Sequence, residues 1–173
     1  VFVDTFVGGG LVTNSHLHTG VHGNAGALAS LPMQPARPGH PSTQLIEAAS
    51  LWELEQNYVD AGLVPTAAYD ERALEAPSAP LTQTWLGLAA GALAHAIASG
   101  TAVLDLGHVV MDGSMSRTLL DALLDRTRAA LGHCNWEGLW QPQLHGGKAG
   151  PQACALGGAM LPFPANFAPG HDG

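Results

Sequence analysis

Basic residues are scarce in this chain: its 173 residues include only 6 Lys and Arg against 14 Asp and Glu, a formal net charge of −8. Such a surface repels a phosphate backbone, because DNA-binding proteins owe most of their affinity to Lys and Arg contacts with phosphates. The chain is therefore a poor candidate for binding DNA itself, although it could be joined to a segment that does.

Cysteines are also few, and the two present, Cys134 and Cys154, lie in no CxxC or CxH cluster. This excludes a disulfide framework and indicates free thiols in a reducing cytosol. No uninterrupted apolar run reaches the roughly 18 residues of a membrane span, since glycines and a histidine interrupt the most apolar stretch, residues 86–99. No signal peptide is visible, so the cytoplasm is the expected location.

The chain lacks the short motifs of several enzyme classes: it has no Gly-x-Ser-x-Gly elbow, no full P-loop and no HExxH zinc motif. Hydrophobic residues make up 46% of the chain and charged residues 12%. That composition supplies enough apolar material for one folded core and argues against a disordered segment.

The N-terminal segment is rich in β-branched and aromatic residues. Residues 1–7 predict a strand, and a second strand starts at Leu11 and ends in a turn at Asn14 and Ser15. Because the chain opens with Val1, already inside a strand, we expect it to be part of a longer protein that continues upstream.

Apolar residues spaced three and four apart predict three long helices after a proline-rich surface loop. The helices are residues 43–61, residues 81–98 with an extension towards Leu104, and a helix capped by Ser114 or Ser116 that ends near Leu131. The first helix is expected to bury Leu45, Ala48, Trp52 and Val59. The third is expected to bury Leu120, Leu123, Leu124 and Leu131, with Asp125 paired to Arg128 on its solvated side.

Shorter elements complete the pattern. A short helix is expected near residues 70–74, strands over residues 108–111 and 139–144, and a closing helix over residues 151–161. The order of these elements predicts an α/β or α+β fold with a mixed sheet.

Three segments together resemble the ROK family of sugar kinases and sugar-responsive repressors. The first is the glycine hairpin TFVGGGLV, residues 5–12, followed by the glycine cluster GVHGNAG, residues 20–26. The second is VVMDG, residues 109–113, similar to the strand-then-glycine element beside the adenine in family kinases. The third, ALGGAML, residues 155–161, resembles the closing helix of the family.

The resemblance implies the actin-like ATPase fold, a ribonuclease-H-like α/β architecture in two lobes. Residues 1–173 would form a single C-terminal lobe, with a mixed sheet and packed helices. The N-terminal lobe, which carries the family's catalytic aspartate, and in many members a winged helix that binds operator DNA, would lie upstream of Val1. We therefore expect no catalytic residue within the chain.

The resemblance implies a phosphate-loop-like segment formed by Thr5, Gly8, Gly9 and Gly10, with Asp112 and Gly113 at the nucleotide's edge. Glycines suit such a loop because bare backbone N–H groups must approach phosphate oxygens closely. Family kinases have the pattern Gly-Thr-Gly-x-Gly-Gly-Gly, and here Asp4 and Phe6 replace two of its glycines. A carboxylate and a bulky ring argue against ATP, and the triple glycine can instead serve only to shape the hairpin.

Family kinases follow their second glycine cluster with Glu-x-Gly-His, whose Glu and His bind sugar hydroxyls and whose His also ligates a structural zinc. Here Ala27 and Ser30 stand at these positions, and Ala27 cannot accept a hydrogen bond from a hydroxyl. The sugar or effector contacts that the resemblance leaves are His22, Gly23, Asn24 and Ser30. No Cys-x-Cys-Gly-x-x-Gly-Cys run follows Ser30, so we expect no structural zinc and no other metal site.

Histidines are numerous but not grouped with other metal ligands. His16, His18 and His22 have no Cys or carboxylate among them, so we expect exposed hairpin histidines. His95 lies on a predicted helix and is expected in the core.

Two functions from different classes remain open. The first is the sugar-sensing and dimerisation lobe of a ROK-family transcriptional regulator: cytoplasmic, homo-oligomeric, without a cofactor, and in contact with DNA only through an upstream domain. The second is an ATP-dependent sugar kinase similar to a glucokinase, which needs MgATP. Ala27 and Ser30 favour the regulator, because the Asn-Ala-Gly-Ala-Leu-x-Ser variant resembles a branch of ROK regulators. A third hypothesis is a structural lobe that binds no ligand.

Overall fold

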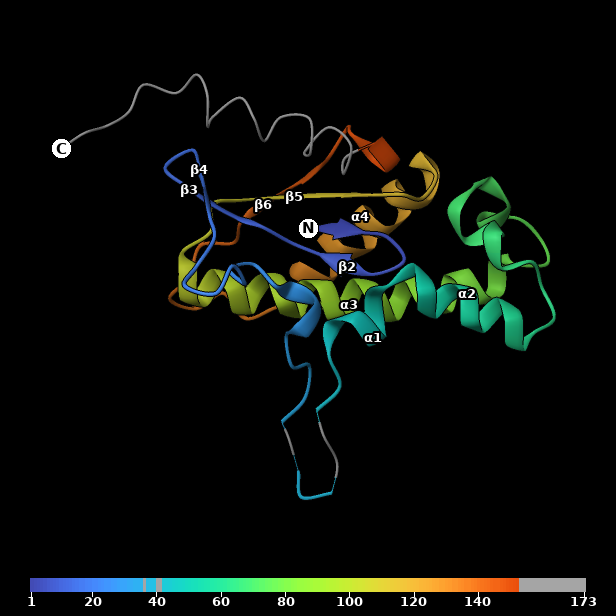
Figure 1. Cartoon of the computed structure of the whole chain (residues 1–173), viewed down its shortest axis with the longest axis horizontal. Helices are drawn as coiled ribbons and strands as arrows, with labels where there is room; N and C mark the ends of the chain where they lie inside the picture. Colours follow the sequence, from blue (N-terminus) through green and yellow to red (C-terminus); the bar gives the residue numbers. More distant parts are fainter. Residues whose placement is uncertain (36, 40–41, 153–173) are drawn as a thin grey trace.

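A four-stranded mixed sheet lies at the centre of the computed structural model, which describes residues 1–35, 37–39 and 42–152 (Figure 1). In the order β2, β1, β5, β6, its strands are Val7–Gly8, Phe2–Val3, His108–Gly113 and Gln143–Gly146. β1 pairs antiparallel with β2 and parallel with β5, and β5 pairs parallel with β6. The mixed sheet and its helices confirm the predicted α/β class.

The single strand predicted over residues 1–7 is wrong, because the chain reverses within it. Residues 4–6 form the turn between β1 and β2, in which the Asp4 N–H donates to the Phe6 carbonyl at 3.0 Å. The segment predicted as one strand is therefore a short hairpin of β1 and β2, and its turn follows the end of β1.

A second hairpin pairs β3 (Leu11–Thr13) with β4 (His16–His18) outside the main sheet. Its turn lies at Asn14 and Ser15, as predicted, and both residues have positive φ angles, 51° and 64°. That backbone is typical of a two-residue type I′ turn.

The first long helix, predicted over residues 43–61, consists of two helices separated by Ser50. They are α1 (Leu45–Ala49) and α2 (Leu51–Asp60). Ser50 has an extended backbone, with φ −77° and ψ 152°, and its hydroxyl accepts a hydrogen bond from the Glu53 N–H at 3.3 Å. Ser50 therefore ends one helix and caps the next.

The break changes which face of α2 is buried. Trp52 and Val59, predicted in the core, are 46% and 48% exposed. The buried residues of α2 are Leu51, Leu54 and Tyr58. The expectation holds for Leu45, in α1, which is fully buried.

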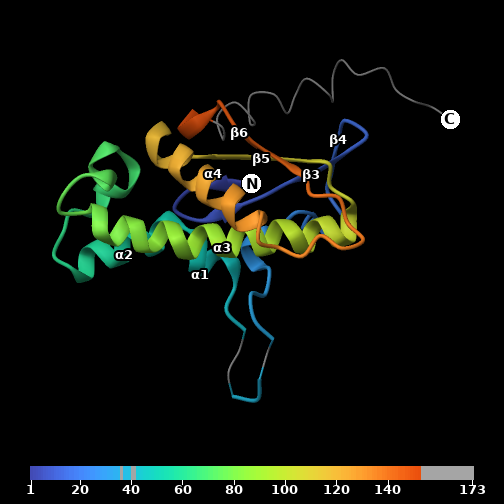
Figure 2. The same ribbon diagram turned by 180° about the vertical axis from the view of Figure 1, so that it is seen from behind.

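The helices gather on one side of the sheet, as Figures 1 and 2 show from opposite directions. The longest, α3 (Ala79–Leu104), packs against α1 and against α4 (Arg117–Leu131). Two 3₁₀ turns, η2 (Pro65–Tyr69) and η3 (Glu71–Leu74), connect α2 to α3, and η3 matches the short helix predicted there.

By length and composition α3 could cross a bilayer, alone among the helices that the structure describes. Its buried side chains, however, include Trp85, Leu86, Leu93 and Ile97, which belong to the main core. We therefore assign α3 as the central core helix of the fold. His95 is exposed on it, contrary to the prediction, because it follows the exposed Leu88 and Gly91 at helical spacing on the solvent side.

Helix α4 follows its prediction closely. Ser116 caps it by accepting a hydrogen bond from the Leu119 N–H at 3.3 Å. Its predicted core residues Leu120, Leu123, Leu124 and Leu131 are all buried. Asp125 and Arg128 pair on the solvated side at 2.8 Å.

The last described strand begins later than predicted. The sequence predicts an extended segment over residues 139–144, whereas β6 covers Gln143–Gly146. Pro142 has no N–H to donate, and the first bond on this edge runs from the Gln143 N–H to the Gly107 carbonyl at 3.0 Å. Of the predicted closing helix, residues 151–161, only the 3₁₀ turn η4 (Gly150–Gln152) lies within the described residues.

Candidate functional site

Three parallel strands end at the same edge of the sheet. The register pairs Val3, at the end of β1, with Gly113, at the end of β5, and pairs Met111 with Gly146, at the end of β6. In open α/β sheets, ligands bind outside the carboxyl ends of the strands. The turn after β1, the Asp112-Gly113 pair and the segment after β6 therefore form the candidate nucleotide edge.

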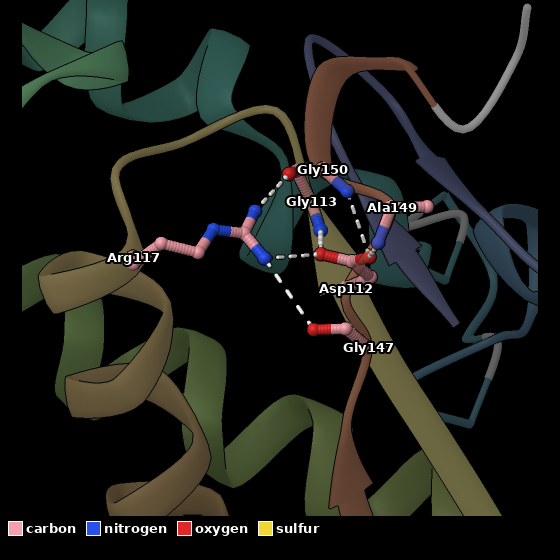
Figure 3. Close-up of polar contacts among 6 residues, drawn as sticks. All are labelled: Asp112, Gly113, Arg117, Gly147, Ala149 and Gly150. Carbon is pink, nitrogen blue, oxygen red and sulfur yellow. Dashed lines mark hydrogen bonds and ion pairs between the residues drawn. The ribbon is translucent and has the colours of Figure 1, made fainter.

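Asp112 binds several groups at this edge with both of its carboxylate oxygens (Figure 3). Its Oδ1 accepts hydrogen bonds from the Gly113 N–H and from Nη1 of Arg117, both at 2.8 Å. Its Oδ2 accepts from the backbone N–H groups of Ala149 and Gly150, at 2.8 and 2.9 Å. Asp112 thus joins the end of β5, the start of α4 and the segment after β6.

The ionised form of Asp112 is favoured in the folded protein. Burial alone would raise the pKa of this carboxyl, but the hydrogen bonds from the backbone N–H groups and from Arg117 outweigh it, and the net pKa is lowered. The backbone N–H groups at this edge are therefore already bonded to an anion, the carboxylate of Asp112.

Two glycines make this arrangement possible. A Cβ atom on Gly147 would lie 2.5 Å from the Cβ of Asp112, and one on Gly113 would lie 2.4 Å from the Val3 carbonyl oxygen. No side chain fits at either position. Gly113, predicted at the nucleotide's edge, is thus required for the approach of β5 to β1.

The turn after β1 is also internally bonded. Oδ1 of Asp4 accepts a hydrogen bond from the Thr5 N–H at 2.7 Å. The Thr5 hydroxyl and the Tyr69 hydroxyl are 2.9 Å apart and share a hydrogen bond. Burial raises the pKa of Tyr69, so this phenol stays protonated. The Thr5 N–H that a phosphate would use is therefore engaged within the chain.

The carbonyl groups of the same turn face the first turn of α2. The Leu51 N–H donates to the Asp4 carbonyl at 2.9 Å, and the Trp52 N–H donates to the Thr5 carbonyl at 3.3 Å. With the Glu53 N–H on the Ser50 hydroxyl, the first three N–H groups of α2 have partners. This helix terminus consequently offers no free donor to an anion.

The two glycine clusters pack against each other, backbone to backbone. A Cβ atom on Gly9 would lie 2.7 Å from the Gly26 carbonyl oxygen, and one on Gly26 would lie 2.8 Å from the Cα of Gly10. Gly8, in contrast, has open space beside it, because a Cβ atom there would have no neighbour within 4 Å. Close packing accounts for Gly9 and Gly26 without any bound phosphate.

A cavity of about 240 Å³ lies between these clusters. Its lining residues are Val7, Gly8, Gly9, Gly23, Asn24, Ala25, Ala27, Leu28 and Ala29. Gly23 and Asn24, predicted as effector contacts, line it, whereas His22 and Ser30 are exposed and are not part of the lining. Asn24 brings the one polar side chain in that lining.

A second cavity, of about 270 Å³, is mainly apolar. It lies between the hairpin β3–β4, α3 and β5, and its lining includes Leu11, Leu93, Ile97, Leu106 and Val109. His108 is the one residue of this lining whose side chain can form hydrogen bonds. This cavity suits an apolar group better than a sugar.

Sequence reasoning missed the partners of Asp112. Arg117, Ala149 and Gly150 lie 5, 37 and 38 residues away in the chain. The sequence does place an arginine at the start of a helix, five residues after an aspartate near the end of a strand, and this spacing could have indicated the ion pair between Arg117 and Asp112. His16 and His18 are exposed, as predicted, and no group of three His, Cys, Asp or Glu side chains gathers within the described part of the chain.

Solved structures with this fold include sugar kinases and a regulator. The ROK hexokinase from Thermus thermophilus matches at 25% identity and a TM-score of 0.67, over 92% of this chain and 55% of that one. A ROK glucokinase from Streptomyces griseus, solved with glucose and AMPPNP, matches at 17% identity and a TM-score of 0.70, over 92% and 58%. A ROK transcriptional regulator, a homologue of the E. coli MLC protein, matches at 16% identity and a TM-score of 0.56, over 84% and 40%.

The chain thus spans little more than half the length of these kinases and has their actin-like ATPase fold. Among curated proteins, none matches the chain. The sequence model of the ROK family matches residues 1–163, almost the whole chain. The chain therefore belongs to the ROK family.

Proposed function

We propose that this chain is the C-terminal, sugar-sensing and dimerisation lobe of a ROK-family transcriptional regulator, and that its kinase chemistry is lost. The observation that carries the proposal is the hydrogen bond from the Thr5 N–H to the Asp4 carboxylate at 2.7 Å. The carboxylate thereby occupies a backbone donor that a phosphate oxygen would otherwise use.

Two effects oppose the binding of ATP at this hairpin. The first is the loss of a donor, since the Thr5 N–H already donates to the Asp4 carboxylate. The second is charge: a carboxylate about 4 Å from a phosphate costs on the order of 1–4 kcal/mol per unit charge between bulk water and a protein surface. Both effects weaken the binding of a polyphosphate and leave sugar binding untouched.

The effector is a sugar or a sugar derivative, bound at the cavity between the glycine clusters. This lobe contributes the Asn24 amide and nearby backbone groups, while Ala27 lies in the lining without a polar side-chain atom. Sugars are recognised through hydrogen bonds to their hydroxyls. Further donors and acceptors therefore come from the part of the protein that this chain does not include, and sugar binding between the lobes shifts the population of DNA-competent dimers.

The remaining partners follow from this role. DNA is contacted through a separate upstream domain, because the net charge of −8 on this chain repels phosphate backbones. The protein is cytoplasmic and homo-oligomeric, and it needs neither a structural zinc nor MgATP.

The second candidate is an ATP-dependent sugar kinase similar to a glucokinase. It is favoured by the hexokinase and glucokinase structures, whose TM-scores of 0.67 and 0.70 exceed the 0.56 of the regulator. Under this alternative MgATP lies on the glycine hairpin, and the catalytic aspartate comes from the other lobe.

Calorimetry and thermal shift on the full-length protein separate the two candidates. A panel of sugars is titrated with and without Mg-AMPPNP, and ADP release from ATP is measured for each sugar. The regulator predicts stabilisation by one sugar class alone, with no heat from AMPPNP. Sugar-dependent ADP release would instead establish a working kinase in which the changes at Asp4 and Ala27 are tolerated.

A further inference from the structure

Two histidines lie side by side on the face of the sheet opposite the helices. Along β5, Val109 and Met111 are buried, whereas His108 and Val110, which alternate with them, are exposed. In a strand, alternate side chains point to opposite faces. On the neighbouring strand β6, His145 is exposed as well.

The two imidazoles face each other at short range. Nδ1 of His108 and Nε2 of His145 are 3.1 Å apart, and the ring centroids are 5.3 Å apart. One ring donates a hydrogen bond and the other accepts it with its lone pair. Both rings extend from adjacent parallel strands, paired over four residues from His108 to Met111, so the backbone holds their separation.

We propose that His108 and His145 bind one divalent transition-metal ion of the class that prefers imidazole, such as Zn²⁺ or Cu²⁺. Metal–nitrogen bonds of about 2.0–2.1 Å across a 3.1 Å gap subtend an angle of about 100° at the metal, between square-planar and tetrahedral values. The ion replaces the hydrogen bond between the rings. Each ring keeps one proton on its other nitrogen, so the donor ring changes tautomer and no proton is lost.

The proposed site is distinct from the zinc site that the family resemblance would place after Ser30. Within the part of the chain that the structure describes, no third His, Cys, Asp or Glu joins this pair. Water therefore completes the coordination, which leaves positions open for a second ligand, as in metal sites that exchange ligands. The net charge of −8 further favours cations near the surface.

Isothermal titration of the full-length protein, prepared without a histidine tag, with ZnCl₂ and with CuCl₂ tests the proposal. The wild type is expected to bind one ion. His108→Asn and His145→Asn should each weaken binding by at least about tenfold, because even the loss of an outer-shell partner costs 10–100-fold in metal affinity. The matched control is the double variant His16→Asn/His18→Asn, which removes two exposed histidines from the β3–β4 hairpin and should leave the stoichiometry and affinity of this site unchanged.

A spectroscopic measurement on the wild type needs no variant. Paramagnetic Cu²⁺ at substoichiometric amounts should broaden the NMR ring resonances of His108 and His145 before those of the other histidines. Equal broadening of all histidines, or unchanged affinity in His108→Asn/His145→Asn, would overturn the proposal. Loss of binding in the hairpin control alone would assign the metal to β3–β4 and overturn it equally.

Discussion

Arg117 binds Asp112 and the backbone beside it with a single guanidinium group. Nη1 donates to Oδ1 of Asp112 at 2.8 Å, and Nη2 donates to the Gly113 carbonyl at 2.9 Å. Oδ2 of Asp112 accepts hydrogen bonds from the N–H groups of Ala149 and Gly150. The carboxylate therefore connects the carboxyl end of β5 to α4 and to the segment after β6. Its contribution to stability should accordingly be large.

Asp112→Asn should lower the free energy of unfolding by about 2–4 kcal/mol, because an amide that keeps Oδ1 as acceptor points its NH₂ group at two backbone donors. Urea denaturation followed by circular dichroism measures the change. The control is Asp125→Asn, which breaks an exposed ion pair with Arg128 and should cost no more than about 0.5 kcal/mol. Equal effects of the two variants would contradict the role assigned to Asp112.

The same carboxyl gives a prediction for pH. The pKa of Asp112 is lowered in the folded state from its ordinary value of 3.8, so its ionised form stabilises the fold. That stabilisation is complete well above pH 3.8 and is lost as the pH falls below 3.8 towards the folded-state pKa. The difference in unfolding free energy between the wild type and Asp112→Asn should therefore be constant from pH 7 to about pH 5 and shrink on acidification below about pH 4. A difference that grows on acidification would contradict this assignment.

The packing of the glycine clusters can be tested with two alanine variants. Gly23 and Gly26 both have positive φ, 74° and 83°, but a Cβ on Gly23 meets no atom within 4 Å while one on Gly26 lies 2.8 Å from the Cα of Gly10. Gly23→Ala should lower the free energy of unfolding by about 1–2 kcal/mol, because of the left-handed backbone alone. Gly26→Ala should lower it by about 1–3 kcal/mol more than Gly23→Ala does, because its Cβ also overpacks the neighbouring backbone. Thermal melts of both proteins give the comparison, and a smaller loss in Gly26→Ala would disprove the close packing.

Elements with strong local signals were predictable from the sequence. Helix α4 has a serine cap and a regular leucine stripe, and its cap at Ser116 and its core face are found where they were expected. The turn at Asn14 and Ser15 is likewise specified by residues that tolerate positive φ. In both cases the determining interactions lie within a few residues along the chain.

The break at Ser50 has remote causes that local periodicity does not contain. The Ser50 carbonyl accepts a hydrogen bond from the Trp85 indole of α3 at 3.1 Å. The first N–H groups of α2 donate to the carbonyls of Asp4 and Thr5, in the N-terminal hairpin. These tertiary contacts set the phase of α2, and for that reason Trp52 is exposed against expectation.

The Asp4 carboxylate is the feature on which the loss of kinase chemistry depends. Asp4→Gly frees the Thr5 N–H and removes one negative charge, and Asp4→Gly/Phe6→Gly restores the glycine pattern of family kinases. We expect Mg-AMPPNP to bind the double variant at least about tenfold more tightly than the wild type, equivalent to about 1.4 kcal/mol. Calorimetry on the full-length proteins measures the two affinities, and thermal melts show whether the variants remain folded.

The single variant Phe6→Gly separates the steric effect of the Phe6 ring on nucleotide binding from the effect of the Asp4 charge. Phe6 is 61% exposed, so its removal should change the stability little while leaving the Asp4 carboxylate on the Thr5 N–H. If charge and donor occupancy exclude the nucleotide, this single variant binds Mg-AMPPNP as weakly as the wild type, and Asp4→Gly accounts for most of the gain. If Phe6→Gly recovers the full affinity, the obstacle is steric, and the carboxylate is compatible with a bound phosphate. Tight binding by the wild type itself would remove the reason for assigning the chain to a regulator.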